Sequence, residues 1–231
     1  MDLINLLYTP LDVPERPAVD IDKFKQWLTA VYPQECLTKT PAWSNSMALY
    51  KDKYPWHLTF GMADGEWQNN FDTEFPEYSK YLYESIGLER HEIVSIIFLP
   101  VRDHVTGLAF WHADVDDLGF RFYVDNEKYL ENPLLLKKTK LPHTRNAMSL
   151  PISDNDIRLQ PEIYTFKMLS PTQSYYLNNY RAVHSPFINV PGSRISGFVN
   201  VYPKYREEVR RRTEAFILQS AAKFKDHTIL W

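Results

Sequence analysis

The sequence contains one cysteine, few glycines and almost no excess of either charge. Its only cysteine, Cys36, excludes an internal disulfide framework and favours a reducing compartment. Lysine and arginine number 26 against 29 acidic residues, so the net charge is −3 and nothing favours binding to nucleic acid or an acidic membrane surface. No hydrophobic run approaches the length of a membrane span, and the first residues lack the basic region of a signal peptide. We therefore expect a soluble, cytoplasmic protein.

Glycine is outnumbered by proline, with 7 glycines against 16 prolines. Because proline interrupts helices and central strands, this balance predicts many short elements joined by stiff turns. The 231 residues suffice for one substantial core, and aromatic residues, at 15% of the chain, supply bulky side chains to fill it. No repeat and no linker divides the sequence, so we expect a single domain over 1–231.

Hydrophobic periodicity predicts helices toward both ends of the chain. A helix is expected over 20–32, where Asp20 is a candidate cap and Pro33 a stop, and a second over 74–86. The last helix is expected over 204–224. Four apolar residues of that helix should face the body of the protein: Val209, Phe216, Ile217 and Ala221.

Short apolar or alternating segments between these helices predict β-strands, with strand and loop over 54–70 and a long polar connection over 137–160. Six strands are expected, at 92–100, 106–115, 119–125, 162–169, 174–179 and 194–202. This order favours a mainly β fold with flanking helices, a double-stranded β-helix (jelly-roll, cupin-like) barrel. In that fold 1–90 would be helical and loop support, 91–202 the jelly-roll core and 203–231 the closing helix.

The run FWHADVDD, residues 110–117, contains the first candidate site. Residues two apart in a strand point to the same side, so His112 and Asp114 would share a face. They supply two of the three ligands of the 2-His-1-carboxylate facial triad found in non-haem Fe(II) oxygenases. A turn histidine hydrogen-bonded to a nearby aspartate would account for the same pair, so the triad reading needs a second histidine.

That second histidine is His184, in the run YRAVHSPFINVPGSRIS. It follows an apolar segment, at the edge of a turn rich in proline and glycine. Arg194 comes ten residues later, and Ser196 lies two further along the same strand face. This spacing of histidine and arginine is typical of proteins that bind 2-oxoglutarate, with the histidine on the metal and the arginine and serine on the far carboxylate. No other histidine in the sequence has an arginine at that offset.

With these residues the chain resembles the Fe(II)/2-oxoglutarate-dependent oxygenases over about residues 91–202. Within them it is most similar to the aspartyl/asparaginyl β-hydroxylase group, which includes small bacterial hydroxylases of free amino acids. The run LGFRFYVDNE, with Arg121 nine residues after His112, and the run SPTQSYYLNNYRAVHSPFINVPGSR match that group. After the arginine the chain reads FYV instead of a HIP-like pattern, so its substrate recognition is expected to differ.

The resemblance implies an activity and a set of site residues. Fe(II) would be held by His112, Asp114 and His184, and the cosubstrate 2-oxoglutarate by Arg194 and Ser196. With O2, the enzyme would hydroxylate an unactivated C–H bond of an amino acid or related small polar molecule and release succinate and CO2.

Several alternatives remain open at this point. Arg121 would bind a carboxylate of the substrate or the C1 carboxylate of 2-oxoglutarate, or it is a surface arginine paired with Asp116 or Asp117. A non-redox cupin-like module for metal or ligand binding would keep the three ligands but have no use for Arg194. A zinc hydrolase would need a general base beside the metal.

Overall fold

The computed structural model describes residues 2–35, 59–100, 107–108, 118–128, 134–138, 163–165, 168–178, 181–188, 190 and 194–231. Its helices are α1 (Ile21–Glu35), α3 (Phe71–Glu74), α4 (Pro76–Glu84) and α6 (Arg206–Lys223), with 3-10 turns η1 (Leu3–Asn5), η2 (Arg90–Glu92), η3 (Pro203–Tyr205) and η4 (Lys225–His227). Its strands are β1 (Leu6–Pro10), β2 (Thr59–Ala63), β3 (Glu66–Trp67), β4 (Ile93–Pro100), β5 (Gly107–Leu108), β6 (Gly119–Asn126), β7 (Leu134–Lys138), β8 (Ile163–Thr165), β9 (Ser174–Leu177), β10 (Ala182–Ile188), β11 (Arg194–Val201) and β12 (Ile229–Leu230).

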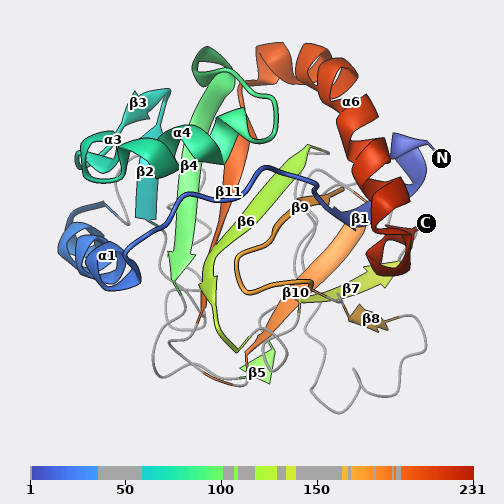
Figure 1. Cartoon of the computed structure of the whole chain (residues 1–231), viewed down its shortest axis with the longest axis horizontal. Coiled ribbons are helices and arrows are strands. Elements are labelled where there is room, and N and C mark those ends of the chain that lie inside the picture. Colours follow the sequence, from blue (N-terminus) through green and yellow to red (C-terminus); the bar gives the residue numbers. More distant parts are fainter. Residues whose placement is uncertain are drawn as a thin grey trace.

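The strands form two antiparallel sheets (Figure 1). Eight strands make the large sheet, in the order β12-β1-β9-β6-β11-β4-β2-β3, and four make the small sheet, β5-β10-β7-β8. Within the described ranges neither sheet closes into a barrel. The expectation of an antiparallel β structure with flanking helices is therefore confirmed at that level, in a mixed α and β protein. In the same ranges, no helix is long and apolar enough to cross a bilayer.

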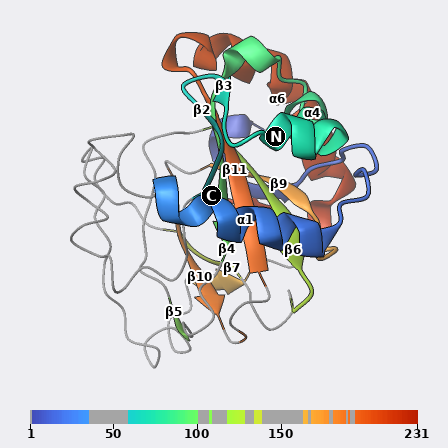
Figure 2. The same cartoon turned by 90° about the vertical axis from the view of Figure 1, so that its left-hand side faces the viewer.

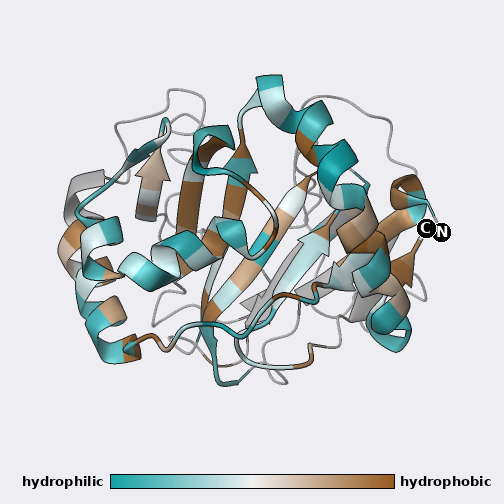
Figure 3. Ribbon diagram, turned by 45° about the horizontal axis from the view of Figure 1, so that its top comes forward, coloured by the Kyte–Doolittle hydropathy of each residue, from teal (hydrophilic) through white to brown (hydrophobic). Residues whose placement is uncertain are grey.

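Helices cover one face of the large sheet and bury an aromatic core there. Phe24 of α1 lies edge-on to Phe98 of β4, with ring centroids 5.1 Å apart, and Phe98 contacts Phe122 of β6 at 5.8 Å. Val209, Ile217 and Ala221 of α6 are fully buried in the same core, as predicted, and Phe216 packs against it. Figure 3 shows hydrophobic strand segments beneath helices whose outer surfaces are hydrophilic. Each buried aromatic stabilises this face by about 1.5–3 kcal/mol.

The opposite face of the large sheet looks toward the small sheet (Figure 2). A second core lies there, and it joins residues of both sheets: Leu7, Tyr8, Tyr123, Leu136, Met168, Tyr175, Leu177 and Ala182. We call the space between the two sheets the inter-sheet site. The second core is richer in tyrosine than the helix-covered core, so tyrosine hydroxyl groups lie in the inter-sheet site.

Strand β6 contributes side chains to both cores, because successive side chains point to opposite faces of the sheet. Phe120 and Phe122 belong to the helix-covered core, whereas Tyr123 belongs to the second core. The alternation is interrupted once, because Ser196 of β11 pairs with Tyr123 while Ile195 pairs with Asp125. Val124 is the extra residue of this β-bulge.

The predicted helices form, with two differences that proline explains. Helix α1 continues through Pro33 to Glu35, because a proline in the last turn removes only one hydrogen bond near the helix end. The expected helix over 74–86 is instead α3 followed by α4. A proline disfavours the helical conformation of the residue before it. Phe75, which precedes Pro76, accordingly has φ −134° and ψ 60° and separates the two helices.

The strands differ more from expectation than the helices do. Residues 1–90, expected as helix and loop support, also supply β1, β2 and β3 to the large sheet. Strand β7 begins before the expected loop at 137–160 and enters it, while residues 139–160 lie outside the described part of the chain. Only β5, residues 107–108, is described of the strand expected over 106–115.

Gly197 of β11 is a position where any side chain should cost stability. A Cβ atom there would lie 2.6 Å from the backbone oxygen of Ile97 and would collide with the ring of Phe122. We expect Gly197→Ala to lower the free energy of unfolding by about 1–3 kcal/mol, because the buried strands cannot separate freely. Urea denaturation monitored by circular dichroism measures this change. An unchanged transition midpoint would show that the sheet relaxes around the methyl group.

An ion pair between Glu92 and Arg212 attaches α6 to η2. The Glu92 carboxylate is 2% exposed and accepts hydrogen bonds from Arg212 Nη2 at 2.5 Å and from the backbone N–H of Glu89 at 2.8 Å. Burial alone would raise the pKa of Glu92, but these hydrogen bonds outweigh it, and the pKa lies below its usual range. The pair therefore stabilises the fold above the pKa of the unfolded carboxyl and loses its effect as the pH falls through the folded pKa.

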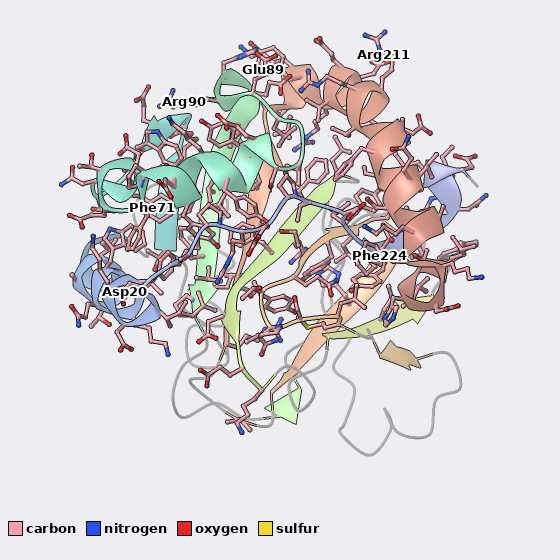
Figure 4. All side chains as sticks on the ribbon, viewed as in Figure 1. Asp20, Phe71, Glu89, Arg90, Arg211 and Phe224 are labelled. Atoms are coloured by element: carbon pink, nitrogen blue, oxygen red, sulfur yellow. The ribbon has the colours of Figure 1, made fainter. Side chains whose placement is uncertain are left out.

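We expect Arg212→Met to lower the free energy of unfolding at pH 7 by about 1–3 kcal/mol, with the lower end favoured because Arg212 is partly exposed. The difference from the wild type should shrink at an acidic pH, below the ordinary range of a glutamate carboxyl, because the pair is lost once the wild-type carboxyl is protonated. Urea denaturation at the two pH values measures this. Arg211→Met is the matched control, since Arg211 lies on the outer surface of α6 (Figure 4) and should be neutral. A deficit that is equal at both pH values would contradict this account.

Candidate functional site

His184 lies within strand β10 and points into the inter-sheet site. It pairs with Leu136 of β7, its side chain is 1% exposed, and its Nε2 atom is 3.2 Å from Nη2 of Arg121 on β6. The sequence predicts it just after a strand, at a turn. The structure corrects this position, because β10 continues through Ser185 and Pro186 to Ile188. The imidazole is therefore held by a regular strand at the junction of the two sheets.

The partners of His184 determine its tautomer. A guanidinium has only donors, so Arg121 requires a lone pair on Nε2. The other nitrogen, Nδ1, is 2.9 Å from the backbone oxygen of Ala182, which can only accept a hydrogen bond. Both contacts are satisfied by one form, the neutral imidazole with its proton on Nδ1 and its lone pair on Nε2. This is the form of histidine that binds a metal ion through Nε2.

A turn before β10 sets the position of that backbone oxygen. The backbone oxygen of Asn178 accepts a hydrogen bond from the N–H of Ala182 at 2.8 Å, and its Oδ1 accepts one from the N–H of Arg181 at 3.2 Å. Asn178 therefore fixes the start of the strand and, through Ala182, the orientation of the imidazole of His184.

Arg121 has the orientation that the alternation of β6 predicts, away from Phe120 and Phe122. Its guanidinium carbon lies 5.4 Å from the ring centroid of Phe198, its neighbour on β11, and its side chain is half-buried. Arg121 therefore contributes to the inter-sheet site. Asp116 and Asp117, its alternative partners, lie outside the described residues.

Arg194, at the start of β11, is the most deeply buried cation of this site. It is 4% exposed, its Nη2 donates a hydrogen bond to the Tyr123 hydroxyl at 3.1 Å, and its guanidinium carbon lies 5.1 Å from the Tyr123 ring centroid. Its Nε and Nη1 are buried with no hydrogen-bond partner among the described residues. Buried donors without partners are costly, so these two groups point to an acceptor supplied by a ligand.

Polar side chains surround the guanidinium of Arg194. Ser196 is buried two residues along β11 and pairs with Tyr123. The ring of Tyr175 on β9 stacks beside that of Tyr123, with centroids 5.6 Å apart. Burial raises the pKa of Tyr175 well above its usual value, with a further contribution from Tyr123. Its hydroxyl group therefore stays protonated near pH 7 and offers a hydrogen bond rather than a charge.

Asn126 is a residue of this site that the sequence does not reveal. It is fully buried and pairs with Arg194 across the β6–β11 ladder. Its Nδ2 donates to the sulfur of Met168 at 3.6 Å, and its Oδ1 has no hydrogen-bond partner among the described residues. Paired residues in antiparallel strands have neighbouring side chains, so this amide lies beside the guanidinium and is available to a ligand.

His112 and Asp114, the other two predicted metal ligands, lie outside the described residues. Among the residues that are described, no group of three histidine, cysteine, aspartate or glutamate side chains could hold a metal ion. The structure thus brings together His184, Arg121, Arg194 and Ser196 between the sheets. The arrangement combines a buried imidazole, whose Nε2 contacts Arg121, with a second guanidinium, that of Arg194, which has two donors without a partner among the described residues.

Comparisons with known proteins add no assignment. No protein-family model matches the chain, and no curated protein matches it significantly in sequence.

Proposed function

We propose that the chain is an Fe(II)- and 2-oxoglutarate-dependent dioxygenase. It would hydroxylate an unactivated C–H bond of an amino acid or a related small polar substrate and act in the reducing cytoplasm. The observation that carries this proposal is the inter-sheet site itself. There, a buried imidazole with its lone pair on Nε2 and a buried guanidinium with two donors that have no partner among the described residues lie on the face of the large sheet opposite the helices.

The strand order supports a double-stranded β-helix for the core. From β4 to β11 the chain passes repeatedly between the sheets, with β4, β6, β9 and β11 in the large sheet and β5, β7, β8 and β10 in the small one. The order β9-β6-β11-β4 faces the order β5-β10-β7-β8, as two interleaved antiparallel sheets do in a jelly roll. Such a core holds its ligands between the sheets, where His184 and Arg194 lie.

The direction of β5 supports the proposed ligand set. Leu108 pairs with Phe187, and the strands are antiparallel, so the chain leaves β5 on the side that leads toward His184. His112 and Asp114 follow Leu108 by four and six residues. We propose that these two side chains and Nε2 of His184 hold Fe(II) as a facial triad.

Arg194 is assigned to the far carboxylate of 2-oxoglutarate. A carboxylate buried between the sheets requires a cationic partner, and the planar guanidinium supplies two parallel donors. Tyr123 accepts a hydrogen bond from Nη2 and holds the guanidinium in place, while Nε and Nη1 have no partner among the described residues. Ser196 would add a hydroxyl donor to the same carboxylate. A cupin-like module without redox chemistry has no use for such a guanidinium, so Arg194 favours the oxygenase.

Bound iron would supply the oxidative step, in which 2-oxoglutarate and O2 are consumed, succinate and CO2 are released and the substrate is hydroxylated. The described residues bind and orient. Ala182 and Asn178 keep the proton of His184 on Nδ1, and the second core around Tyr175 and Leu177 excludes water from the inner end of the site.

The test is turnover by anaerobically prepared protein supplied with Fe(II) and 2-oxoglutarate and then exposed to O2. Succinate is measured by mass spectrometry, with a panel of free amino acids as substrates. We expect succinate that requires both Fe(II) and 2-oxoglutarate and increases with the correct substrate. Calorimetry with 2-oxoglutarate is run in parallel, and an absence of binding would favour the non-redox module instead.

A further inference from the structure

We propose that Arg121 and a metal ion compete for Nε2 of His184, so that metal binding requires the guanidinium to move aside. This inference rests on the metal centre of the proposed function and adds a role for Arg121 that neither carboxylate assignment includes. Arg121 would then be a positioning residue that sets the affinity for the metal.

The competition follows from the geometry of one lone pair. Nη2 of Arg121 lies 3.2 Å from Nε2 of His184, and its hydrogen is directed at that nitrogen because Nδ1 carries the ring proton. A histidine nitrogen that binds a divalent metal holds it at about 2.0–2.1 Å along the same lone pair. One lone pair accepts either a hydrogen bond or a metal bond, so the two contacts exclude each other.

Arg121 and Arg194 differ in burial. Arg121 is half-buried and packs over the ring of Phe198, so part of its side chain remains in contact with solvent. Arg194 is 4% exposed and is held by the Tyr123 hydroxyl. The two guanidinium groups on this face therefore have different roles. One binds the anion in a fixed position, and the other responds to what His184 binds.

Charge acts in the same direction as the hydrogen bond. An arginine remains protonated at any pH of interest, and its charge opposes a dication nearby. Removing the Arg121 guanidinium should therefore increase the affinity for the metal ion. An increase in metal affinity is a distinctive result, because most substitutions around a metal site weaken metal binding.

The experiment measures Co(II) affinity by anaerobic calorimetry, with Co(II) as a stand-in for Fe(II) that also reports its coordination by visible absorption. We expect Arg121→Met to lower the Co(II) dissociation constant about ten-fold or more, the value of one charge-assisted hydrogen bond. Methionine retains the unbranched stem of the side chain as far as the position of Nε but has no charge and donates no hydrogen bond. Arg121→Gln, also neutral, provides a second variant if the first does not fold, as judged by circular dichroism.

Two controls isolate the contact from its charge. Arg194→Met removes an equal charge from the same face of the neighbouring strand, and we expect it to change Co(II) affinity much less than Arg121→Met does. Arg211→Met removes a charge from the outer surface of α6 (Figure 4) and should have no effect. If Arg194→Met tightens binding as much as Arg121→Met, charge alone is responsible and the competition for Nε2 is overturned.

His184→Ala separates failure of this inference from failure of the proposed function. If wild-type binding of Co(II) is lost in His184→Ala but is equal in Arg121→Met and the wild type, the inference alone is wrong. If the wild type binds no Co(II), or binds it independently of His184, the proposed metal centre is wrong and the inference fails with it. Tighter binding in Arg121→Met that still depends on His184 supports both.

Discussion

His184→Ala should abolish succinate formation from 2-oxoglutarate and weaken metal binding by at least about 100-fold. The expectation follows from the chemistry of the side chain, because alanine removes a nitrogen whose lone pair is directed into the inter-sheet site. Substitutions of residues that merely support a metal ligand already cost about 10–100-fold in affinity, so loss of a ligand itself should exceed that range. Succinate is measured by mass spectrometry and metal affinity by anaerobic calorimetry with Co(II).

His91→Ala is the matched control for this variant. His91 is exposed on η2, lies 3.3 Å from a carboxylate oxygen of Glu89 and contacts the ring of Tyr205, and we assign it no part in the reaction. It should leave succinate formation and metal binding unchanged. Thermal unfolding of both variants tests whether the loss in His184→Ala is a loss of fold. Turnover that persists in folded His184→Ala would exclude this histidine as a metal ligand.

Arg194→Met should weaken 2-oxoglutarate binding by about 30-fold or more, the effect of removing one partner of a buried, hydrogen-bonded charge pair. The same variant should be at least as stable as the wild type, because it removes two buried donors that have no partner among the described residues. We expect its free energy of unfolding to rise by about 1–3 kcal/mol, the usual cost of such unsatisfied groups. Affinity and stability should therefore change in opposite directions.

Calorimetry with 2-oxoglutarate and urea denaturation measure the two quantities. Arg194→Lys retains the charge but lacks the planar pair of donors, so its affinity should fall between those of the wild type and Arg194→Met. Equal 2-oxoglutarate affinity in all three proteins would remove Arg194 from the cosubstrate site. A large loss of stability in Arg194→Met would instead make the arginine a structural group.

The central strands of the large sheet could be predicted because each is an apolar or alternating segment bounded by turn residues. In β6, Phe120 and Phe122 flank Arg121, and this pattern alone places the arginine on the face opposite the helices, where the structure has it. Strand β7 could not be predicted in this way. Its run LLLKK is too short for its period to separate a strand from a helix. Strand β10 was obscured by Pro186, a residue that usually argues against a central strand.

The residues of the candidate site also divide into those that a local sequence pattern predicts and those that it does not. Arg194 and Ser196 could be proposed from their spacing after His184, because both lie on one regular strand. The contact between Arg121 and His184 joins strands of different sheets that are 63 residues apart in sequence, and no local pattern reports such a meeting. Asn126 was missed because the bulge at Val124 reverses the alternation of β6 before the strand ends.

The bulged residue Val124 also determines which side chain of β6 lies across from Arg194. If the pairing of Ser196 with Tyr123 continued without interruption, Arg194 would face Asp125 instead of Asn126. A neighbouring aspartate would neutralise the guanidinium from within and occupy the place of an incoming carboxylate. With Val124 inserted, Asp125 turns to the helix side, where its Oδ2 lies 3.6 Å from Nζ of Lys25. One added residue thus determines that an amide, and not a carboxylate, stands across from the guanidinium of Arg194.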